Sequence, residues 1–518
     1  MRRIVHGLAT AMVLLTAAGC NVTDNDIEHW KRTQRGPRKI TTVLMQGSYA
    51  LPMRVHAARA LVEMKHPNAN GLELLQAALQ AMPSAEREQI VHALLPELGA
   101  MMRAQGSTPS QGPTDAQMRA KDGAYVIIRG DGRTSFASAE DRAALSALVL
   151  DWLLADFNQR ALAGSYTAEQ VVNAIGPSSA ERLTQAISSA DEQIPVAVEL
   201  AKLIHGVGTP EAQSAAAARL VTVSRELESP AVDDRLRARA RQMLTQPGAP
   251  APAEDAVARG GDRLRDQYLT VIFEAIRTLG RPNGTEYLLG VARSATTPLA
   301  RRKLALTALA GSVSSAHTAG LLEVVNCTEG PNCDLDLRGL AIDRIGETRD
   351  RAVVPQLFTL FDQANGGVAG MAFTIRWKLG ESVLRLGGPS IIPDFVSHLG
   401  PRPAPFAGYT FAEINGYAQA IGDMTPPPRE VMRRYTAANH PVAVRLLALM
   451  FLGVKGEESD LALLQPMTSD ATPIQGEGWS EEQLATVGAV ATRAREQLQR
   501  ALRAAQPTPS PTPTNPAQ

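Results

Sequence analysis

The sequence has 518 residues, and its 52 Lys plus Arg are matched by 52 Asp plus Glu, so the formal net charge at pH 7 is zero. With this balance the protein has no net positive charge to attract nucleic acid, and nothing in the sequence resembles a basic nucleic-acid-binding face. We therefore exclude the class of nucleic-acid-binding proteins. Apolar residues make up 44% of the chain but aromatic residues only 4%. A core built mainly from Leu, Ala and Val favours closely packed helices over a β-sandwich.

Residues 1–19 resemble the signal peptide of a bacterial lipoprotein. A positive start at Arg2 and Arg3 precedes an apolar stretch from Leu8 to Ala18, and small residues lead into Cys20. The alternatives are an ordinary signal peptide or a short membrane anchor, but the stretch is shorter than the roughly 20 residues that span a bilayer. The resemblance implies that Cys20 carries fatty acids such as palmitate. It also implies an outer-membrane protein that faces the periplasm, with surface exposure left open.

Residues 20–39 are predicted to form a solvated tether between this anchor and the folded chain. The stretch is polar and acidic from Asn21 to Glu28 and basic from Trp30 to Lys39. An alternative places the basic residues near anionic head groups, with Trp30 at the interface between lipid and water.

A first helical block and a connector come next. Residues 40–102 have the apolar spacing of N-terminal helical repeats. Residues 103–122 include a segment rich in Gly, Ser, Pro and Gln, which is typical of a flexible linker.

Residues 123–245 are predicted to combine one β-hairpin with a helical region. Tyr125-Val-Ile-Ile128 and Arg133–Phe136 flank a Gly-rich turn, which favours a small hairpin at 124–136. The remainder carries helix-capping patterns such as Thr167-Ala-Glu-Gln170. Residues 246–262 contain a Pro-rich segment and are predicted to be a second linker.

Residues 263–470 show a recurrence of glycine near the ends of apolar helices. By subtraction of residue numbers, the intervals are 31, 35, 41, 35 and 31 residues, and the positions are Gly280, Gly311, Gly346, Gly387, Gly422 and Gly453. Such a period indicates an α-solenoid, in which each helix pair buries its apolar face against the next pair. In the best-formed unit, Leu337, Ala341 and Ile345 share one helix face, and Gly346 is expected to end that helix in the left-handed conformation.

An Arg-x-x-Ala pattern opens several of these helices. It occurs at Arg54–Ala57, Arg302–Ala305, Arg338–Ala341 and Arg445–Ala448. Together with the closing Leu-Gly or Ile-Gly, the pattern is similar to that of the HEAT-repeat family, including its lyase-type relatives, over about half of the chain. The resemblance implies an all-α solenoid of HEAT-like helix pairs.

A solenoid offers a long concave surface for binding. Arg and Trp are enriched in binding hot spots, and five such residues are expected on or near this surface, namely Arg302, Arg338, Arg376, Trp377 and Arg445. The alternative is that these arginines bond neighbouring turns and carboxylates inside the array.

Cys327 and Cys333 flank a Gly-Pro turn and are predicted to form a structural disulfide in an oxidising periplasm. The alternative, a redox or metal pair, has little support because two thiols make only half of a zinc site.

The carboxyl end is predicted to close the array. Residues 471–505 include a long helix from Glu481 to Ala505, which suits the cap that a solenoid needs. Residues 506–518 form a Pro- and Thr-rich tail that is expected to be disordered.

No catalytic motif is found, since HExxH, GxSxG and GxxxxGK[ST] patterns are all missing from the sequence, and we expect no enzyme activity, cofactor or metal. The sequence thus favours a lipid-anchored envelope scaffold that binds other envelope proteins. The rival function is a ligand-binding receptor or enzyme with a site in residues 138–244. A third option is a structural envelope protein.

Overall fold

The computed structural model describes residues 22–104, 112–245, 251–327, 333–364, 371–400, 408–480 and 482–505. The predicted signal sequence, Cys20 and the tail from residue 506 lie outside the described residues. The chain divides into two compact units, Met1–Arg239 and Ala240–Gln518, each described by itself below. Among the described residues no helix is both long and apolar enough to cross a membrane.

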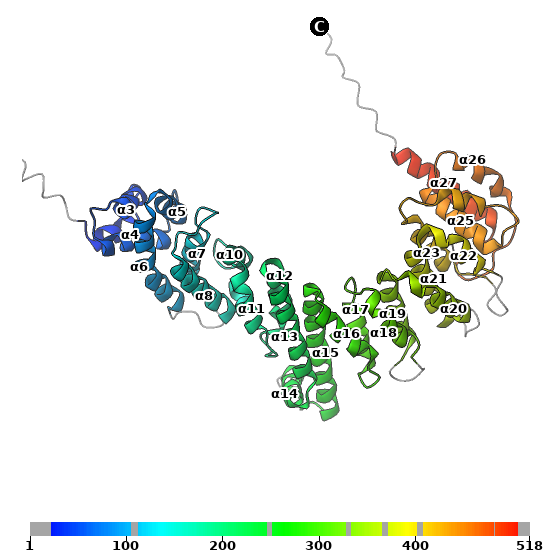
Figure 1. Cartoon of the computed structure of the whole chain (residues 1–518), viewed down its shortest axis with the longest axis horizontal. Helices are drawn as coiled ribbons and strands as arrows, with labels where there is room; N and C mark the ends of the chain where they lie inside the picture. The colour runs from blue at the N-terminus through cyan, green and yellow to red at the C-terminus, as the bar shows by residue number, and fades with distance from the viewer. Residues whose placement is uncertain are drawn as a thin grey trace, which may run out of the picture. The chain divides into compact units, whose positions relative to one another are not determined.

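Unit 1 is built from helices that pack on neighbours in the chain and on the helix after next (Figure 1). Its helices are α2 (Asp24–Trp30), α3 (Gly36–Met45), α4 (Leu51–Glu63), α5 (Gly71–Ala81), α6 (Ser84–Arg103), α7 (Asp115–Arg129), α8 (Ala139–Ala155), α9 (Phe157–Arg160), α10 (Ala168–Ile175), α11 (Ala180–Ala186), α12 (Ala197–Val207), α13 (Pro210–Glu228) and α14 (Asp233–Leu244), of which the last crosses the unit boundary.

The β-hairpin expected at 124–136 is wrong, because this stretch begins as the second half of the helix α7. Residues 120–128 are all buried, with Ile127 at 0% and Ile128 at 2% exposure. β-Branched residues favour strands, but a helix that is covered on all sides accommodates the same apolar run. A short loop follows, in which the Asp131 carboxylate accepts the backbone N–H groups of Arg133 and Thr134.

Where a solvated tether is expected at residues 20–39, the structure contains packed helices from residue 22 onward. Thr23 caps α2 through a capping box, and Ile27 of that helix is fully buried. Lys31 reaches Glu63 of α4 at 2.7 Å. The segment therefore forms the packed helices α2 and α3. Burial of the single apolar side chain of Ile27 in the core stabilises this packing.

In the part of unit 2 that the structure describes, six helix pairs are followed by one closing helix. The helices are α15 (Glu254–Leu279), α16 (Pro282–Arg293), α17 (Leu299–Ala308), α18 (Thr318–Val325), α19 (Leu335–Glu347), α20 (Val354–Ala364), α21 (Met371–Gly387), α22 (Ile392–Ser397), α23 (Phe411–Gly422), α24 (Arg429–Arg434), α25 (Val442–Lys455), α26 (Asp460–Leu464) and α27 (Val487–Ala505). Short 3-10 helices at 177–179, 194–196, 230–232, 315–317, 351–353, 388–391 and 465–469 complete the regular structure of the two units.

The first helices of the pairs in unit 2 form a continuous row, because each contacts the first helix of the next pair. The row runs through α15, α17, α19, α21, α23, α25 and α27 (Figure 1). This stacking is that of an all-α solenoid, and the fold class predicted from the sequence is confirmed. No strand occurs in the part of the chain that the structure describes; two isolated bridges pair His66 with Ala69 and Pro473 with Thr486.

The repeated glycines serve two different purposes. Gly280 ends α15 in the left-handed conformation, as expected for a helix C-cap. Gly346 does not: α19 continues through it to Glu347, and a Cβ there would lie 2.8 Å from the Ser382 hydroxyl of α21. Gly453 likewise lets α25 approach Ala494 of α27. At these positions glycine is needed for close packing between neighbouring first helices.

The closing helix is shorter than predicted. It begins at Val487, not Glu481, and the residues before it form a loop in which Ile474 N–H bonds the Ala485 carbonyl. Ala491, Ala494 and Leu498 are buried as α27 covers α25 and α26. The helix therefore supplies the last apolar face that a stacked array must cover.

Candidate binding sites on the helical array

Three of the predicted Arg-x-x-Ala arginines tie one helix to the end of the helix before it. Each is the fourth residue of its helix, and its Nε donates to a carbonyl in the last turn of the preceding helix. The pairs are Arg54 with Leu44 at 2.8 Å, Arg302 with Ala292 at 2.7 Å and Arg338 with Val325 at 2.7 Å. A cation at a helix C-terminus satisfies unpaired carbonyls and opposes the negative end of the helix dipole.

The arginines predicted as partner contacts are therefore largely inside the array. Arg302 is 3% exposed, Arg376 is fully buried and Arg445 is 6% exposed. Arg338 is half-buried, and the Trp377 indole N–H donates to Glu381 on its own helix at 2.7 Å. The arginines follow the alternative that the sequence left open, because they bond to neighbouring turns and carboxylates inside the array. A partner could reach Arg338 and Trp377 only at their exposed edges.

Arg376 and Glu413 form a fully buried ion pair between α21 and α23. The other carboxylate oxygen of Glu413 accepts the backbone N–H of Thr410 at 2.9 Å, and the Thr410 hydroxyl closes the capping box of α23. The guanidinium also lies 4.8 Å from the centre of the Tyr409 ring. One buried charge pair thus fixes a helix start, a helix crossing and the position of an aromatic side chain.

Arg445 makes an ion pair with Asp470, which lies in the loop before α27. Hydrogen bonds from Thr472 and from Arg445 lower the pKa of Asp470 to about 2. A carboxyl group whose folded-state pKa is depressed stabilises the fold above its unfolded-state pKa, and this stabilisation disappears as the pH falls through the folded value.

Asp470→Asn is therefore expected to lower the free energy of unfolding of unit 2 by about 2 kcal/mol at pH 7, from the depression of the pKa below 3.8. Near pH 2 the difference between the two proteins should shrink, because the carboxyl group is then about half protonated in the folded protein and almost fully protonated in the unfolded chain. Urea unfolding at both pH values measures this. An equal difference at pH 7 and pH 2 would show that the loss comes from packing and not from charge.

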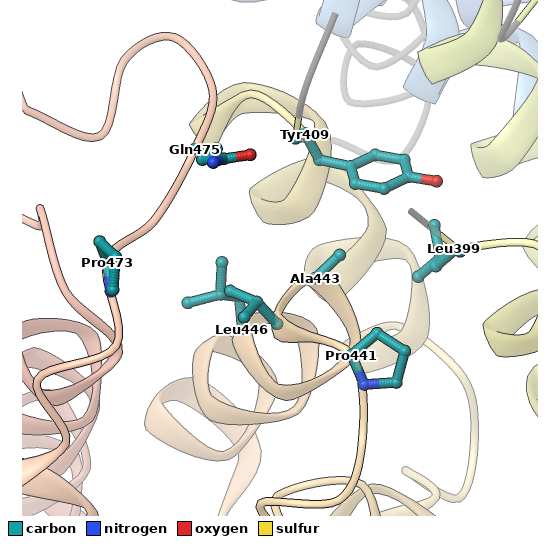
Figure 2. A pocket seen from close by; sticks show the side chains of 10 residues that line it. Leu399, Tyr409, Pro441, Ala443, Leu446, Pro473 and Gln475 are labelled. Carbon is teal, nitrogen blue, oxygen red and sulfur yellow. The ribbon is translucent and has the colours of Figure 1, made fainter. Parts of the chain in front are cut away.

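An apolar pocket of about 500 Å³ lies in unit 2 (Figure 2). It is formed by the residues that follow α22, the residues just before α23, the start of α25 and the loop before α27. Its lining consists of Leu399, Gly400, Gly408, Tyr409, Pro441, Val442, Ala443, Leu446, Pro473 and Gln475.

The inner wall of the pocket is rigidly held. Tyr409 and Leu446 are 4% and 2% exposed, and the backbone carbonyl of Tyr409 accepts the buried Trp479 indole N–H at 2.7 Å. Pro473 and Gln475 lie exposed at the rim, facing Tyr409 and Ala443 across the opening (Figure 2). This arrangement suits the burial of apolar side chains, with the Gln475 amide as a polar group at the edge.

A second pocket, of about 450 Å³, occurs in unit 1 within the region that the sequence named for the rival function. Its apolar part includes Phe157, Val196 and Leu203, and Leu162 at its edge is 81% exposed. Its polar part is mixed in charge and consists of Asn158, Thr167, Glu169, Asn173, Glu199 and Lys202.

A buried charge pair also organises unit 1. Lys121 is fully buried and Asp122 is 2% exposed, and their charged atoms are 2.6 Å apart. Burial lowers the pKa of Lys121. The Asp122 carboxylate accepts the backbone N–H groups of Ser165 and Tyr166 at 2.7 and 3.3 Å. Lys121 donates to the carbonyls of Ala163 and Tyr166, so the pair fixes the loop between α9 and α10.

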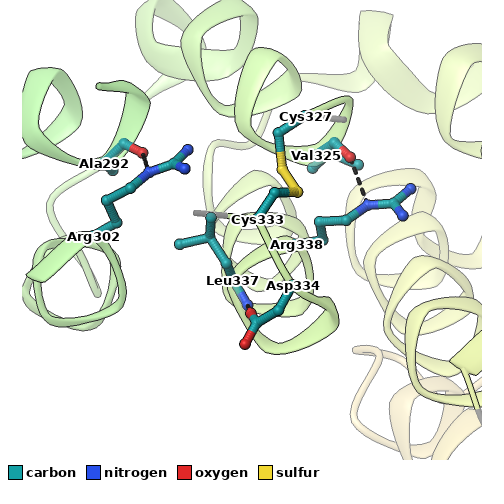
Figure 3. The surroundings of a disulfide bond; sticks show 8 residues. All are labelled: Ala292, Arg302, Val325, Cys327, Cys333, Asp334, Leu337 and Arg338. Carbon is teal, nitrogen blue, oxygen red and sulfur yellow. Dashed lines mark hydrogen bonds between the residues drawn. A yellow bond between two sulfur atoms is a disulfide. The ribbon is translucent and has the colours of Figure 1, made fainter. Parts of the chain in front are cut away.

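Cys327 and Cys333 are joined in a disulfide between the end of α18 and the start of α19 (Figure 3). The same turn contains the bond from Arg338 to the Val325 carbonyl, and Asp334 caps α19 through the N–H of Leu337 at 2.8 Å. The disulfide therefore reinforces a connection that the arginine and the helix cap already define.

Several residues of these sites carried only a partial signal in the sequence. Thr410 and Glu413 form a readable capping pattern, but nothing local indicates that Glu413 faces Arg376. The Lys121–Asp122 pair looks like any exposed charged dipeptide. Pocket residues such as Tyr409 and Pro473 come from separate elements, so no spacing along the chain could connect them.

No protein-family model and no curated protein matches the chain. The crystal structure of Kap121p bound to Pho4p matches 94% of this chain and 52% of that chain, at 10% identity and a TM-score of 0.40. The Kap95:Nup1 complex matches 95% and 65% of the two chains, at 12% identity and a TM-score of 0.25. The chain spans about half the length of the first of these, and we base no functional argument on the likeness.

Proposed function

We propose that this protein is a lipid-anchored scaffold of the bacterial cell envelope that binds a protein partner through the apolar pocket of unit 2. The proposal is carried by the pocket itself, whose inner wall is apolar and whose rim is open to solvent. Its volume of about 500 Å³ is large enough to take apolar side chains of a partner segment. Buried anchors of this kind account for most of the energy in protein interfaces.

The internal use of the arginines supports this location over the one first expected. Arg302, Arg376 and Arg445 bond within the array and are at most 6% exposed, so they leave little for a partner to contact. A scaffold acts by holding its partner, and this proposal includes no chemical step.

Anchoring at the membrane rests on the sequence before Cys20, which resembles a lipoprotein signal. The Cys327–Cys333 disulfide supports an oxidising compartment such as the periplasm, because disulfides are rare in the reducing cytosol. We further propose the outer membrane as the location, facing the periplasm.

Ala443→Arg is expected to abolish partner binding, because the new side chain would occupy the pocket from the first turn of α25. A photo-crosslinking residue placed at the exposed rim position Gln475 reports the contact in intact cells. We expect a discrete crosslinked protein in the parent chain, and its loss in the Ala443→Arg variant.

Ala462→Arg is the matched control, since Ala462 is exposed on α26 and does not line the pocket. It should leave the crosslink unchanged. Equal loss in both variants, or a crosslink that survives Ala443→Arg, would refute the pocket as the binding site. Circular dichroism of both variants checks that the fold is retained.

The second candidate function, a ligand-binding receptor or enzyme, is favoured by the unit 1 pocket in residues 157–206. Mass spectrometry of metabolites released from the purified protein tests it. A small molecule that is released from the parent chain and is lost in a Leu203→Trp variant, while the Gln475 crosslink is missing, would favour this function over the scaffold.

A further inference from the structure

The first two helices of unit 1 bring four exposed cations together. Arg32 and Arg35 lie in the turn between α2 and α3, and Arg38 and Lys39 lie in the first turn of α3. All four side chains are exposed, whereas Gly36 and Pro37 between them are buried and hold the turn against the core. The basic half of the segment is therefore a fixed surface, which we call the basic turn.

The basic turn is not used for ion pairing within the protein. Among the described residues none of its four cations forms an ion pair with a carboxylate, whereas their neighbour Lys31 pairs with Glu28 and Glu63. Lys39 lies 4.9 Å over the half-buried Trp30 ring. The pKa of Asp26 is lowered by hydrogen bonds from Thr23 and, to a smaller extent, by the charge of Lys39. Arg32, Arg35 and Arg38 are thus exposed and without an ion pair among the described residues.

Helix stability does not explain these charges. The N-terminus of a helix carries the positive end of the dipole, so basic residues in the first turn are unfavourable there. α3 has no acidic residue in its first turn and no side-chain cap to offset them. A basic surface retained against this preference is a candidate for binding something outside the chain.

The acidic residues of α2 are largely occupied elsewhere. Glu28 contacts Lys31 at 2.6 Å and His56 of α4 at 3.1 Å, and Asp26 accepts hydrogen bonds from the N-cap residue Thr23. Asp24 is 3.8 Å from His56. Asp24 and Glu28 therefore face α4, while Asp26 is held at the start of α2 and also acts on Lys39.

We propose that the basic turn binds the head groups of anionic phospholipids and thereby orients unit 1 on the membrane. For its place beside the bilayer, this inference rests on the proposed lipid anchor at Cys20. Three peptide steps separate Cys20 from Thr23, at most about 11 Å of chain, and α2 adds roughly 10 Å more. Together these lengths keep the basic turn within about 21 Å of Cys20, so its side chains can reach the head groups, where lipid charge acts within about a Debye length. Trp beside such charges suits the interface.

The test uses the mature chain with Cys20→Ser, so that no acyl chain contributes to binding. Co-sedimentation is measured with phosphatidylcholine vesicles and with vesicles that also contain phosphatidylglycerol. We expect binding to the anionic vesicles only, and loss of binding when the salt concentration is raised, because screening weakens surface charges. Arg32→Ser/Arg35→Ser/Arg38→Ser should weaken binding at least tenfold.

Arg103→Ser/Arg129→Ser/Arg133→Ser is the matched control, since it removes three exposed arginines of unit 1 that lie outside the basic turn. Binding that is equal for the two vesicle types, that is missing altogether, or that falls equally in both triple variants would overturn the proposal. So would tighter binding to single-stranded DNA than to the anionic vesicles.

The outcomes separate this inference from the proposed function. Vesicle binding by the Cys20→Ser chain does not depend on lipidation, and the Gln475 crosslink does not depend on the basic turn. A crosslink that persists without vesicle binding would refute only the lipid-binding role of the basic turn. Vesicle binding without a crosslink would refute only the scaffold function.

Discussion

Replacing Arg376 by Met is expected to lower the free energy of unfolding of unit 2 by about 3–5 kcal/mol, because it leaves the Glu413 carboxylate buried without its cation. Both side chains are fully buried, so water cannot solvate the charge that remains. Urea denaturation followed by circular dichroism measures the change. The same substitution should loosen Tyr409, whose ring lies against the guanidinium at the inner wall of the pocket.

Arg293→Met is the matched control in the same array. Arg293 pairs with Glu323, but the two side chains are 45% and 58% exposed, so the loss should be below about 1 kcal/mol. The double variant Arg376→Met/Glu413→Gln should recover part of the stability, because it removes the unpaired charge and retains an amide for the cap. A cost for Arg376→Met no larger than that for Arg293→Met would contradict the assignment of a buried pair.

Asp122→Ala is expected to destabilise unit 1 by a comparable amount, about 3–5 kcal/mol. The substitution leaves the Lys121 ammonium buried with only backbone carbonyls as partners, and it frees the N–H groups of Ser165 and Tyr166. Hydrogen exchange should therefore accelerate in the loop between α9 and α10 before it does elsewhere in the unit.

The control for this change is Asp151→Ala. Asp151 pairs with Arg182, and both side chains are 51% exposed, so we expect a loss below about 1 kcal/mol. If Asp122→Ala unfolds unit 1 at the same urea concentration as Asp151→Ala, or leaves exchange in the loop unchanged, the buried pair does not hold that loop.

Much of the architecture could be predicted because each helix pair repeats the same local rule. Leu337, Ala341 and Ile345 are all fully buried, as their spacing on one helix face indicates. The small residues of the Arg-x-x-Ala pattern, such as Ala305 and Ala448, are also fully buried where neighbouring first helices meet.

The errors came from positions where the surroundings override a local preference. Tyr125–Ile128 has strand propensity, but the core of unit 1 surrounds it and it is helical. Gly346 has the residue type of a C-cap, yet its missing side chain makes room for Ser382. Ile27 is one apolar residue in a polar segment, too little to predict that α2 packs.

The site could be predicted less well than the fold. The sequence singled out Arg302 and Arg445 but could not show whether they bond inside the array or contact a partner. Both roles place an arginine at the same position of the helix. The pocket is visible only when Leu446 of α25 and Pro473 of the loop before α27 are known to lie near each other. The spacing of apolar residues along the chain does not contain that information. Charge pairs such as Arg376 with Glu413 depend on the stacking of successive pairs.

Lipidation of Cys20 is what would hold this helical array at a membrane, and both the scaffold and the basic turn take their place in the cell from it. The mass of the amino-terminal peptide of the mature protein, purified from its native membrane, measures it directly. We expect a peptide that begins at Cys20 and carries fatty acyl chains. A peptide that begins at another residue, or a Cys20 with an unmodified mass, would contradict the account.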